Sequence, residues 1–221
     1  MNRSITAVSA LVLLTLAACN QGTRDGGSSI DAAGNPWFAA AASNDAASLS
    51  AAESSGADVN AHEKRDYNTP LHVAAEAGNE AAVRSLLSRG AQPDAVDEDR
   101  RTPLMLACHR SKTGAALALI NGGASQEPRD RQEQTALMFA ARNGNLELVR
   151  AMIARHAPLD AQRSDGWTAL HLAAREGQID VVRALKDAGA STTLRDKRGR
   201  SAADVAGSSG KSEVVKALGN L

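Results

Sequence analysis

The side chains of this chain that could carry catalysis or bind a metal are few. Zinc sites bring together several histidine or cysteine ligands at short sequence spacings, with carboxylates supporting the histidines. No two histidines here have that spacing with a carboxylate partner nearby, so the sequence predicts no metal site. The residues considered are His62, His72, His109, His156, His171, Cys19 and Cys108.

Cys108 is the candidate for a catalytic nucleophile, with the neighbouring His109 as its candidate base. A reactive thiol needs an accessible, electropositive setting. Neighbours in sequence on a helix point about 100° apart, so this pair is poorly arranged for proton transfer. Cys108 also aligns with Ala75, Ala141 and Ala174 in segments of the same pattern. We interpret it as a buried structural thiol.

A third chemical candidate is the run Gly-Ser-Ser-Gly-Lys-Ser at residues 207–212, which is similar to part of a phosphate-binding loop. The complete motif needs an earlier glycine, where this chain has Val205, and it follows a strand, whereas a helical pattern comes before this run. We interpret the run as a turn between helices. No Gly-x-Ser-x-Gly nucleophile motif occurs either. We therefore expect no enzymatic activity, no cofactor and no small-molecule substrate; an enzyme that uses Cys108 or the histidines is the alternative.

Composition restricts the function further. The 221 residues carry 25 basic and 25 acidic side chains, so no excess positive charge is available for the phosphate backbone of a nucleic acid. Only two tryptophans, two phenylalanines and one tyrosine are present. With so few aromatic side chains, the hydrophobic core must be filled by aliphatic residues, which favours closely packed helices over a sandwich or barrel.

The first nineteen residues have the layout of a secretory signal. Arg3 gives a positive start, and residues 7–18 form an apolar run that is too short for a permanent membrane span of about 20 residues. The run ends in Leu-Ala-Ala-Cys at residues 16–19, which resembles the lipobox of bacterial lipoproteins. An ordinary secretory signal followed by a chance cysteine is the alternative.

The lipoprotein resemblance implies that residues 1–18 are removed and that Cys19 carries the lipid, in the form of palmitate or similar acyl chains. Two or three acyl chains would hold the protein firmly on a membrane. Residues 19–35, rich in Gly, Ser, Asp and Asn, would form a flexible tether that reaches about 20–25 Å. The absence of Asp after Cys19 points, by the Gram-negative sorting pattern, to the periplasmic side of the outer membrane.

The strongest signal in the rest of the chain is an internal repeat. Five similar segments begin at residues 69, 102, 135, 168 and 201, a constant advance of 33 residues. A weaker copy begins at residue 36 with the register shifted by one. Each is followed by a second apolar stripe at helical spacing, as in Leu146, Val149, Met152 and Ile153. The segments are TPLHVAAEAG, TPLMLACHRS, TALMFAARNG, TALHLAAREG and SAADVAGSSG.

This pattern resembles the ankyrin repeat, a β-turn followed by two helices with a Thr-Pro-Leu-His-x-Ala signature. The resemblance implies an all-α solenoid over residues 36–221, with repeats near 36–68, 69–101, 102–134, 135–167, 168–200 and 201–221. The threonines that open the segments are good helix N-caps, and proline suits the position after them. His72 and His171 are expected to join neighbouring turns by imidazole hydrogen bonds.

The resemblance also implies a binding face, made by the turn tips and the exposed side of the first helices. Arg and Trp are the residue types that most often carry interface energy. Trp167 stands where the other repeats have polar residues, so we expect it to be available to a partner and not required by the fold. The alternative is a solvated turn with the indole lying over arginine stems. The candidate partner-binding residues are Arg65, Asp66, Asn68, Arg100, Arg101, Arg131, Gln134, Arg142, Trp167, Arg175, Arg198 and Arg200.

Taken together, the sequence predicts a lipid-anchored periplasmic protein that binds another protein through an arginine-rich face and performs no chemistry itself. Two versions of this hypothesis stay open. One is an immunity protein that inhibits a toxin delivered to the periplasm. The other is an accessory factor of a periplasmic enzyme, for example one in peroxide defence.

Overall fold

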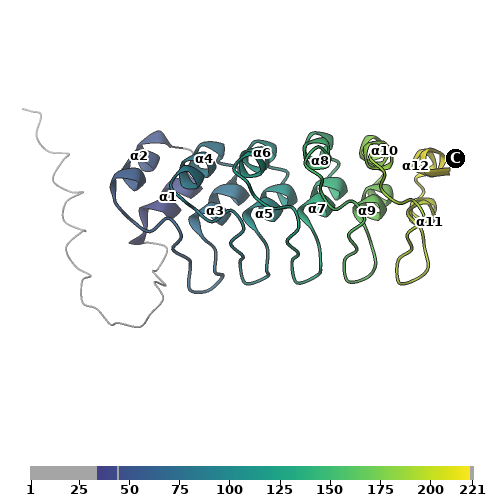
Figure 1. Ribbon diagram of the computed structural model, residues 1–221, viewed down its shortest axis with the longest axis horizontal. Helices are drawn as coiled ribbons and strands as arrows, with labels where there is room; N and C mark the ends of the chain where they lie inside the picture. The colour runs from purple at the N-terminus through teal and green to yellow at the C-terminus, as the bar shows by residue number, and fades with distance from the viewer. Residues whose placement is uncertain (1–33, 44, 220–221) are drawn as a thin grey trace, which may run out of the picture.

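The computed structural model describes residues 34–43 and 45–219; the expected signal peptide, Cys19 and most of the tether lie outside them. Within this part the chain forms twelve helices in six successive pairs, one pair in each predicted repeat (Figure 1). The helices are α1 (Pro36–Ala42), α2 (Ala46–Ser54), α3 (Pro70–Ala77), α4 (Glu80–Ser88), α5 (Pro103–His109), α6 (Thr113–Asn121), α7 (Ala136–Arg142), α8 (Leu146–Ile153), α9 (Ala169–Glu176), α10 (Ile179–Asp187), α11 (Ala202–Ser208) and α12 (Ser212–Gly219).

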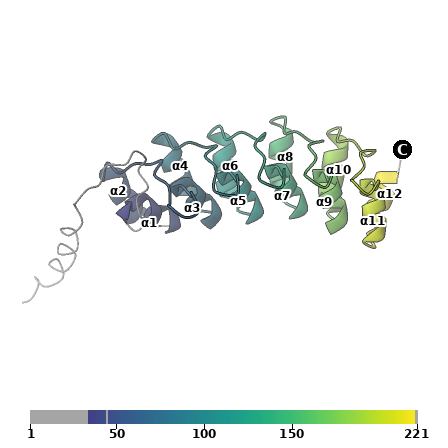
Figure 2. The same ribbon diagram turned by 90° about the horizontal axis from the view of Figure 1, so that it is seen from below.

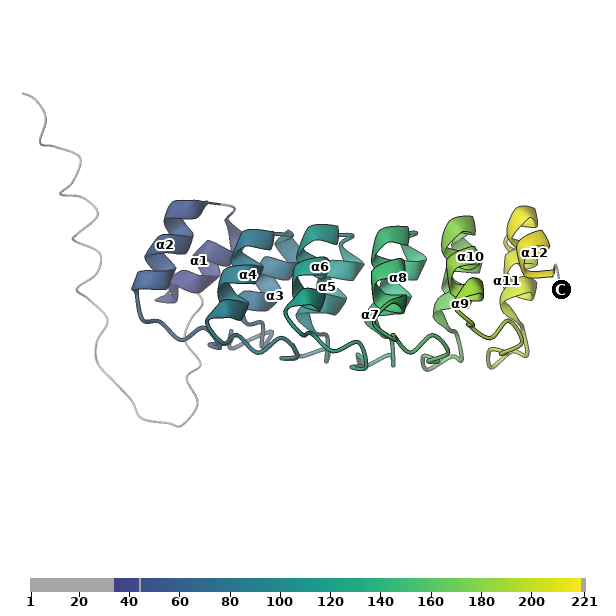
Figure 3. The same ribbon diagram turned by 45° about the horizontal axis from the view of Figure 1, so that its top comes forward.

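The helices form two parallel rows along an elongated array. The first helices of the pairs pack on one another from α1 to α11, and the second helices pack on one another from α4 to α12. Seen from below and at an angle, the order along the array follows the order in the chain (Figures 2 and 3). The predicted all-α repeat solenoid is therefore confirmed.

Small residues allow the first helices to lie close together. Alanine occupies the same place in five successive repeats, at residues 74, 107, 140, 173 and 206, and each of these alanines is fully buried. The second helices contribute larger side chains to the same core, such as Leu86, Leu119, Leu148 and Leu185. No single helix pair could bury this apolar surface alone, so stability comes from stacking.

The start of each first helix follows the sequence rule for N-caps. Thr69, Thr102, Thr135 and Thr168 are the N-caps of α3, α5, α7 and α9, in extended backbone conformation. Pro70 and Pro103 follow at the first helical position, where the missing N–H has no partner to lose. The predicted helix starts are confirmed.

Two buried histidines join adjacent repeats. His72 Nε2 lies 3.0 Å from the carbonyl oxygen of Arg101, and His171 Nε2 lies 3.1 Å from that of Arg200. Because a carbonyl only accepts, Nε2 carries the proton and Nδ1 accepts from the threonine N-cap of its own helix. Burial lowers the pKa of both imidazoles, so they are held neutral. The predicted imidazole links are confirmed.

Between the helix pairs the chain forms hairpin loops that project to one side of the array (Figure 1). We call their tips the first to fifth fingers, residues 64–68, 97–101, 130–134, 163–167 and 196–200. Each finger is joined to the next by one backbone hydrogen bond of 3.0 Å. The donors and acceptors are Glu98 N to Asp66 O, Arg131 N to Asp99 O, Ser164 N to Gln132 O and Lys197 N to Asp165 O.

Three fingers are also organised from within by a buried aspartate, at residues 97, 130 and 196. One carboxylate oxygen accepts two backbone N–H groups of its finger, and the other accepts from the side chain four residues later. Desolvation opposes ionisation of Asp196, but the hydrogen bonds from Arg200 and Arg198 outweigh it and lower its pKa to about 2. These carboxylates therefore serve the fold of the fingers.

None of the helices in the described part of the chain is both long and apolar enough to cross a membrane.

The neutral histidines predict a pH dependence of stability. The ordinary histidine pKa is 6.5, and the folded-state pKa of His72 and His171 lies below it. Below about pH 6.5 the unfolded chain binds protons that the folded chain does not, so stability is full above this pH and falls as the pH drops through it. The unfolding free energy measured in urea should be lower at pH 5.5 than at pH 7.5.

The double variant His72→Gln, His171→Gln should be less stable at pH 7.5 and should lose less on acidification. A residual slope is expected from His109, whose pKa is also lowered. An unchanged pH slope in the double variant would contradict the assignment.

Candidate protein-binding face

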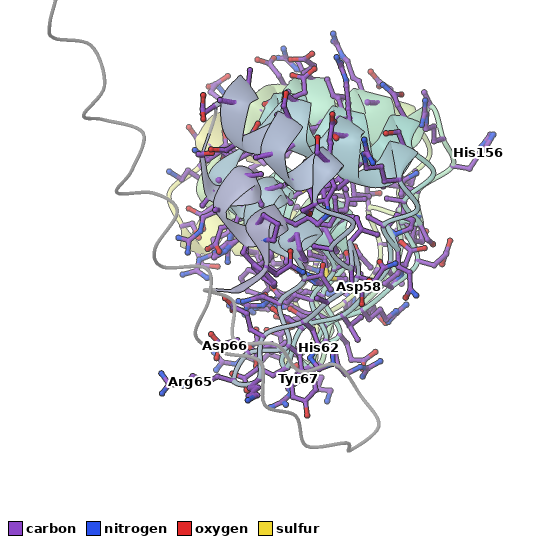
Figure 4. All side chains as sticks on the ribbon, turned by 90° about the vertical axis from the view of Figure 1, so that its left-hand side faces the viewer. Asp58, His62, Arg65, Asp66, Tyr67 and His156 are labelled. Carbon is purple, nitrogen blue, oxygen red and sulfur yellow. The ribbon has the colours of Figure 1, made fainter. Side chains whose placement is uncertain are left out.

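The fingers and the last turns of the first helices form one continuous side of the array, which we call the finger face. In the view along the array, Arg65, Asp66 and Tyr67 of the first finger lie at the edge farthest from the helices, whereas His156 projects from a different edge (Figure 4). Equivalent positions recur every 33 residues, so each finger adds its own set of side chains to the face. The helix row contributes Glu76, His109, Arg142 and Arg175.

The structure brings the predicted binding residues together on this face, but it exposes them unequally. Five of the arginines are exposed: Arg65, Arg100, Arg131, Arg175 and Arg198. A second group is half-buried: Asp66, Asn68, Arg101, Arg142 and Arg200. Gln134 and Trp167 are buried, at 5% and 7% exposure.

Several of the arginines are already engaged by carboxylates of the fingers. Arg101 and Arg200 each form an ion pair of 2.8 Å with the buried aspartate of their own finger. Arg100 reaches Glu133 of the next finger at 3.8 Å, and Arg131 reaches Asp99 at 3.9 Å. These contacts reduce the charge that the face offers to a partner.

Three arginines of the face stay without such a contact. Within the described residues, Arg65, Arg142 and Arg198 make no ion pair within 4 Å. Arg65 and Arg198 lie at opposite ends of the face, in the first and fifth fingers, and Arg142 lies between them on α7. Their guanidinium groups are therefore free to donate to carboxylates of another molecule.

Strained backbone carries side chains at the tips of three fingers. Tyr67, Arg100 and Glu133 occupy the fourth position of their fingers with φ of 56°, 61° and 61°, where the last two fingers have Gly166 and Gly199. A non-glycine residue in this left-handed region costs free energy, of order 1 kcal/mol. Strain of this kind concentrates at functional sites.

Tyr67 is a feature of the face that the sequence reasoning missed. Its ring is 53% exposed and stacks on His62, with ring centroids 5.2 Å apart and planes at 19°. An exposed tyrosine on a rigid tip is well suited to interface contacts. The sequence feature that could have revealed it is the alignment of Tyr67 with Gly166 and Gly199 of the later fingers, a turn position where a large side chain is unusual.

The expectation that Trp167 is available to a partner and not required by the fold is wrong. Its indole N–H donates to Asp196 Oδ2 of the next finger at 3.1 Å, and the ring belongs to the core cluster. Three guanidinium groups, of Arg163, Arg175 and Arg200, lie 5.1–5.7 Å from the ring centroid. The indole thus fills the junction of the fourth and fifth fingers.

The fourth finger differs from three others in the residue that organises it. Where three other fingers have an aspartate, this one has Arg163, and Asp165 accepts from the Arg163 guanidinium and from the backbone N–H of Trp167. The side-chain hydrogen bonds from Arg163 are the main reason that the pKa of Asp165 is lowered. Asp165 is occupied by Arg163 and by the backbone of Trp167, and the indole N–H donates to Asp196 of the next finger.

Gln134 is likewise not free to contact a partner. Its amide donates to Asp130 at 3.1 Å and to Gln132 at 2.8 Å, so it completes the third finger internally.

Cys108 lies where a structural thiol is expected. It is fully buried in α5, and burial raises the pKa of its thiol far above the usual range. Its slot matches the alanines of the other repeats, and this agrees with the interpretation from sequence. Among the described residues, no group of three or more His, Cys, Asp or Glu side chains could hold a metal ion.

Comparison with known proteins identifies one family. A model described as ankyrin repeats (3 copies) matches the chain in four overlapping stretches, residues 17–130, 83–163, 112–196 and 137–220. No curated protein matches the chain.

The burial of Trp167 predicts a large loss of stability on truncation. Trp167→Ala should lower the unfolding free energy by about 3–5 kcal/mol, because it leaves a cavity at the junction of two repeats. Trp167→Phe should lower it by about 1 kcal/mol, since the ring remains and only the hydrogen bond to Asp196 is lost. Urea unfolding followed by far-UV circular dichroism measures both.

Arg198→Ala is the matched control at an exposed tip and should change stability by no more than about 0.5 kcal/mol. If Trp167→Ala unfolds at the same urea concentration as the unchanged protein, the indole does not support the array.

Proposed function

The chain belongs to the ankyrin-repeat family, and we propose that it is a non-catalytic interaction module that binds a partner protein through the finger face. Ankyrin repeats are protein–protein interaction modules. The observation that carries the choice of face is the set of arginines without ion pairs among the described residues, Arg65, Arg142 and Arg198, spread over the length of the array.

The finger face is suited to this role because its backbone is fixed while its side chains differ. Hydrogen bonds between fingers hold the tips in place before binding, which reduces the entropy lost on association. Arg100 and Glu133 hold strained backbone at these tips, where glycine would be less costly. A binding role for the side chains would account for that cost.

The complementary partner surface is acidic. Unpaired guanidinium groups at the edge of an interface steer an oppositely charged partner and add specificity. Such attraction between exposed charges weakens with salt, since the Debye length falls from about 10 Å at 0.1 M to 3 Å at 1 M.

We further propose that the array is tethered to the bacterial envelope by a lipid on Cys19 and binds its partner in the periplasm. The support is the sequence Leu-Ala-Ala-Cys at the end of a signal-like apolar run. The array begins at α1, so the tether would place the first finger nearer to the membrane end of the chain than the fifth.

The tether proposal predicts lipid attachment at one of the two cysteines. In cells fed labelled palmitate, the full chain should incorporate the label, and Cys19→Ser should lose it and keep its signal segment, seen as slower migration on a gel. Cys108→Ala is the control and should stay labelled, because alanine already occupies that slot in three other repeats. Label retained by Cys19→Ser would exclude a lipid on this residue.

The binding proposal predicts capture of a partner that depends on the fingers and on salt. The full chain, purified on an affinity resin from mildly solubilised envelopes of the source bacterium, should retain one protein at 0.1 M salt and release it at 1 M. The double variant Arg65→Ala, Arg198→Ala should retain at most a tenth as much.

The control is Arg150→Ala, which removes an exposed arginine from the second helix of the fourth pair, away from the fingers. Partner capture that is unchanged in the double variant, or reduced equally in the control, would show that the finger face is not the binding surface.

A further inference from the structure

A cavity opens on the finger face between the second and third fingers. Its volume is about 230 Å³, and it lies where these fingers meet the ends of α5 and α7. Pockets that enclose a whole small-molecule ligand have volumes of about 300–1,000 Å³, so this one is sized for a single side chain. Its lining consists of Asp99, Arg101, His109, Asp130, Arg131, Gln132, Gln134, Phe139 and Arg142.

Arg142 is the cation of the cavity that has no counter-charge. Its guanidinium lies 5.5 Å from the ring centroid of Phe139, and within the described residues it makes no hydrogen bond or ion pair. Phe139 is buried and forms an apolar wall that holds the stem of the arginine in place. The charged end is left to face an incoming group.

The two carboxylates of the cavity do not neutralise its three arginines. Asp130 accepts the backbone N–H groups of Gln132 and Gln134 and also the Gln134 amide. Asp99 is shared by Arg101 at 3.3 Å and Arg131 at 3.9 Å. Arg101 also pairs with Asp97, outside the lining, at 2.8 Å, so Arg142 is the arginine of the lining that has no carboxylate partner among the described residues.

His109 lies beside this arginine in the lining and has free ring nitrogens. Its ring packs against Phe139, with centroids 5.3 Å apart, and neither nitrogen bonds to another described residue. Desolvation lowers the pKa of His109, and the charges of Arg142, Arg110 and Arg101 lower it further. Glu76 on α3 opposes them.

We propose that this cavity binds the carboxylate of a glutamate or aspartate side chain presented by an acidic segment of the partner protein, with Arg142 as its main donor. The proposal rests on the proposed function and names the chemistry that the finger face recognises. Arg142 would donate two parallel N–H hydrogen bonds to the two carboxylate oxygens, the geometry in which arginine binds carboxylate most strongly. Arg131, at the rim, would supply a second charge.

The site couples carboxylate binding to protonation of His109. A carboxylate in the cavity offsets the field of Arg142, Arg110 and Arg101 and favours the imidazolium form, while Glu76, Asp99 and Asp130 stay where they are. Binding therefore takes up a proton, and affinity should rise as the pH falls from 7.5 to 6.0. Glutamate side chains, with an ordinary pKa of about 4.3, remain ionised over this range.

The test uses the full chain and the peptide acetyl-Gly-Glu-Gly-Glu-Gly-amide, with the corresponding Gln peptide as the uncharged control. Binding is followed by NMR through the imidazole signals of His109 and the side-chain N–H signals of the arginines. The Glu peptide should bind with shifts at His109, and the Gln peptide should bind at least tenfold more weakly. Affinity for the Glu peptide should increase at least twofold between pH 7.5 and pH 6.0.

Three variants locate the site. Arg142→Gln should weaken binding of the Glu peptide at least tenfold, and Arg131→Gln should weaken it less. His109→Gln should bind with an affinity that no longer depends on pH. Arg150→Gln, on the second helix of the same pair, is the matched control and should leave the affinity unchanged within twofold. Far-UV circular dichroism verifies that each variant is folded.

The proposal is overturned if the Gln peptide binds as well as the Glu peptide, or if Arg142→Gln does not weaken binding. Displacement of the peptide by an equal concentration of inorganic phosphate would also overturn it, since the cavity would then be a site for small anions. These failures are separable from failure of the finger face as a whole. If only the cavity proposal fails, the double variant Arg65→Ala, Arg198→Ala still reduces partner capture to a tenth or less. If the finger face is not the binding surface, the double variant captures the partner as well as the unchanged protein does.

Discussion

The close approach of the first helices is the constraint on which the rest of the structure depends. At residues 74, 107, 140, 173 and 206 the helix presents an alanine that is completely buried by the next helix. A larger side chain at any of these positions would force neighbouring pairs apart, because packed cores tolerate little extra volume. Every repeat must therefore present a small residue at the same place to its neighbour, and in the sequence this alanine recurs every 33 residues.

Once the helices are stacked, the fingers are fixed by a separate set of contacts. One backbone hydrogen bond joins each finger to the next, and buried aspartates hold three of the fingers from within. These contacts use backbone groups and, in the three fingers with a buried aspartate, that aspartate and the side chain four residues later, so the exposed tip positions need not serve the fold. The stability of the fingers and the proposed recognition of a partner thus depend on different residues. For this reason a chain with no net charge can keep Arg65, Arg142 and Arg198 without ion pairs on the finger face, among the residues that the structure describes.

The sequence was sufficient for the repeating features of the helices and insufficient for the contacts that arise between unlike fingers. Threonine N-caps, the two histidine links and the buried slot of Cys108 follow from aligned positions, because the same local geometry recurs. The burial of Trp167 does not. It depends on Arg163 replacing an aspartate in one finger and on Asp196 being available in the next, a combination that no single repeat displays. Gln134 was misjudged for a similar reason, since its alignment with arginines concealed its bond to Asp130.

The junctions between fingers also differ in how they are joined, and the cavity lies at one of the two where methionine, Met105 or Met138, stands in place of the linking histidine. His72 links the first and second fingers, and the fourth and fifth are joined by both His171 and Trp167. After the second finger the histidine position is occupied by Met105, which is buried and cannot bond to the next finger. Among the described residues, the second and third fingers are joined by the backbone bond from Arg131 to Asp99 and by two ion pairs near 4 Å. At the junction of the second and third fingers there is no imidazole or indole link, and a cavity lined in part by three arginines opens there. The junction that lacks the histidine link thus holds a cavity that a side chain from another molecule can enter, and the carboxylate of that side chain would join the two fingers.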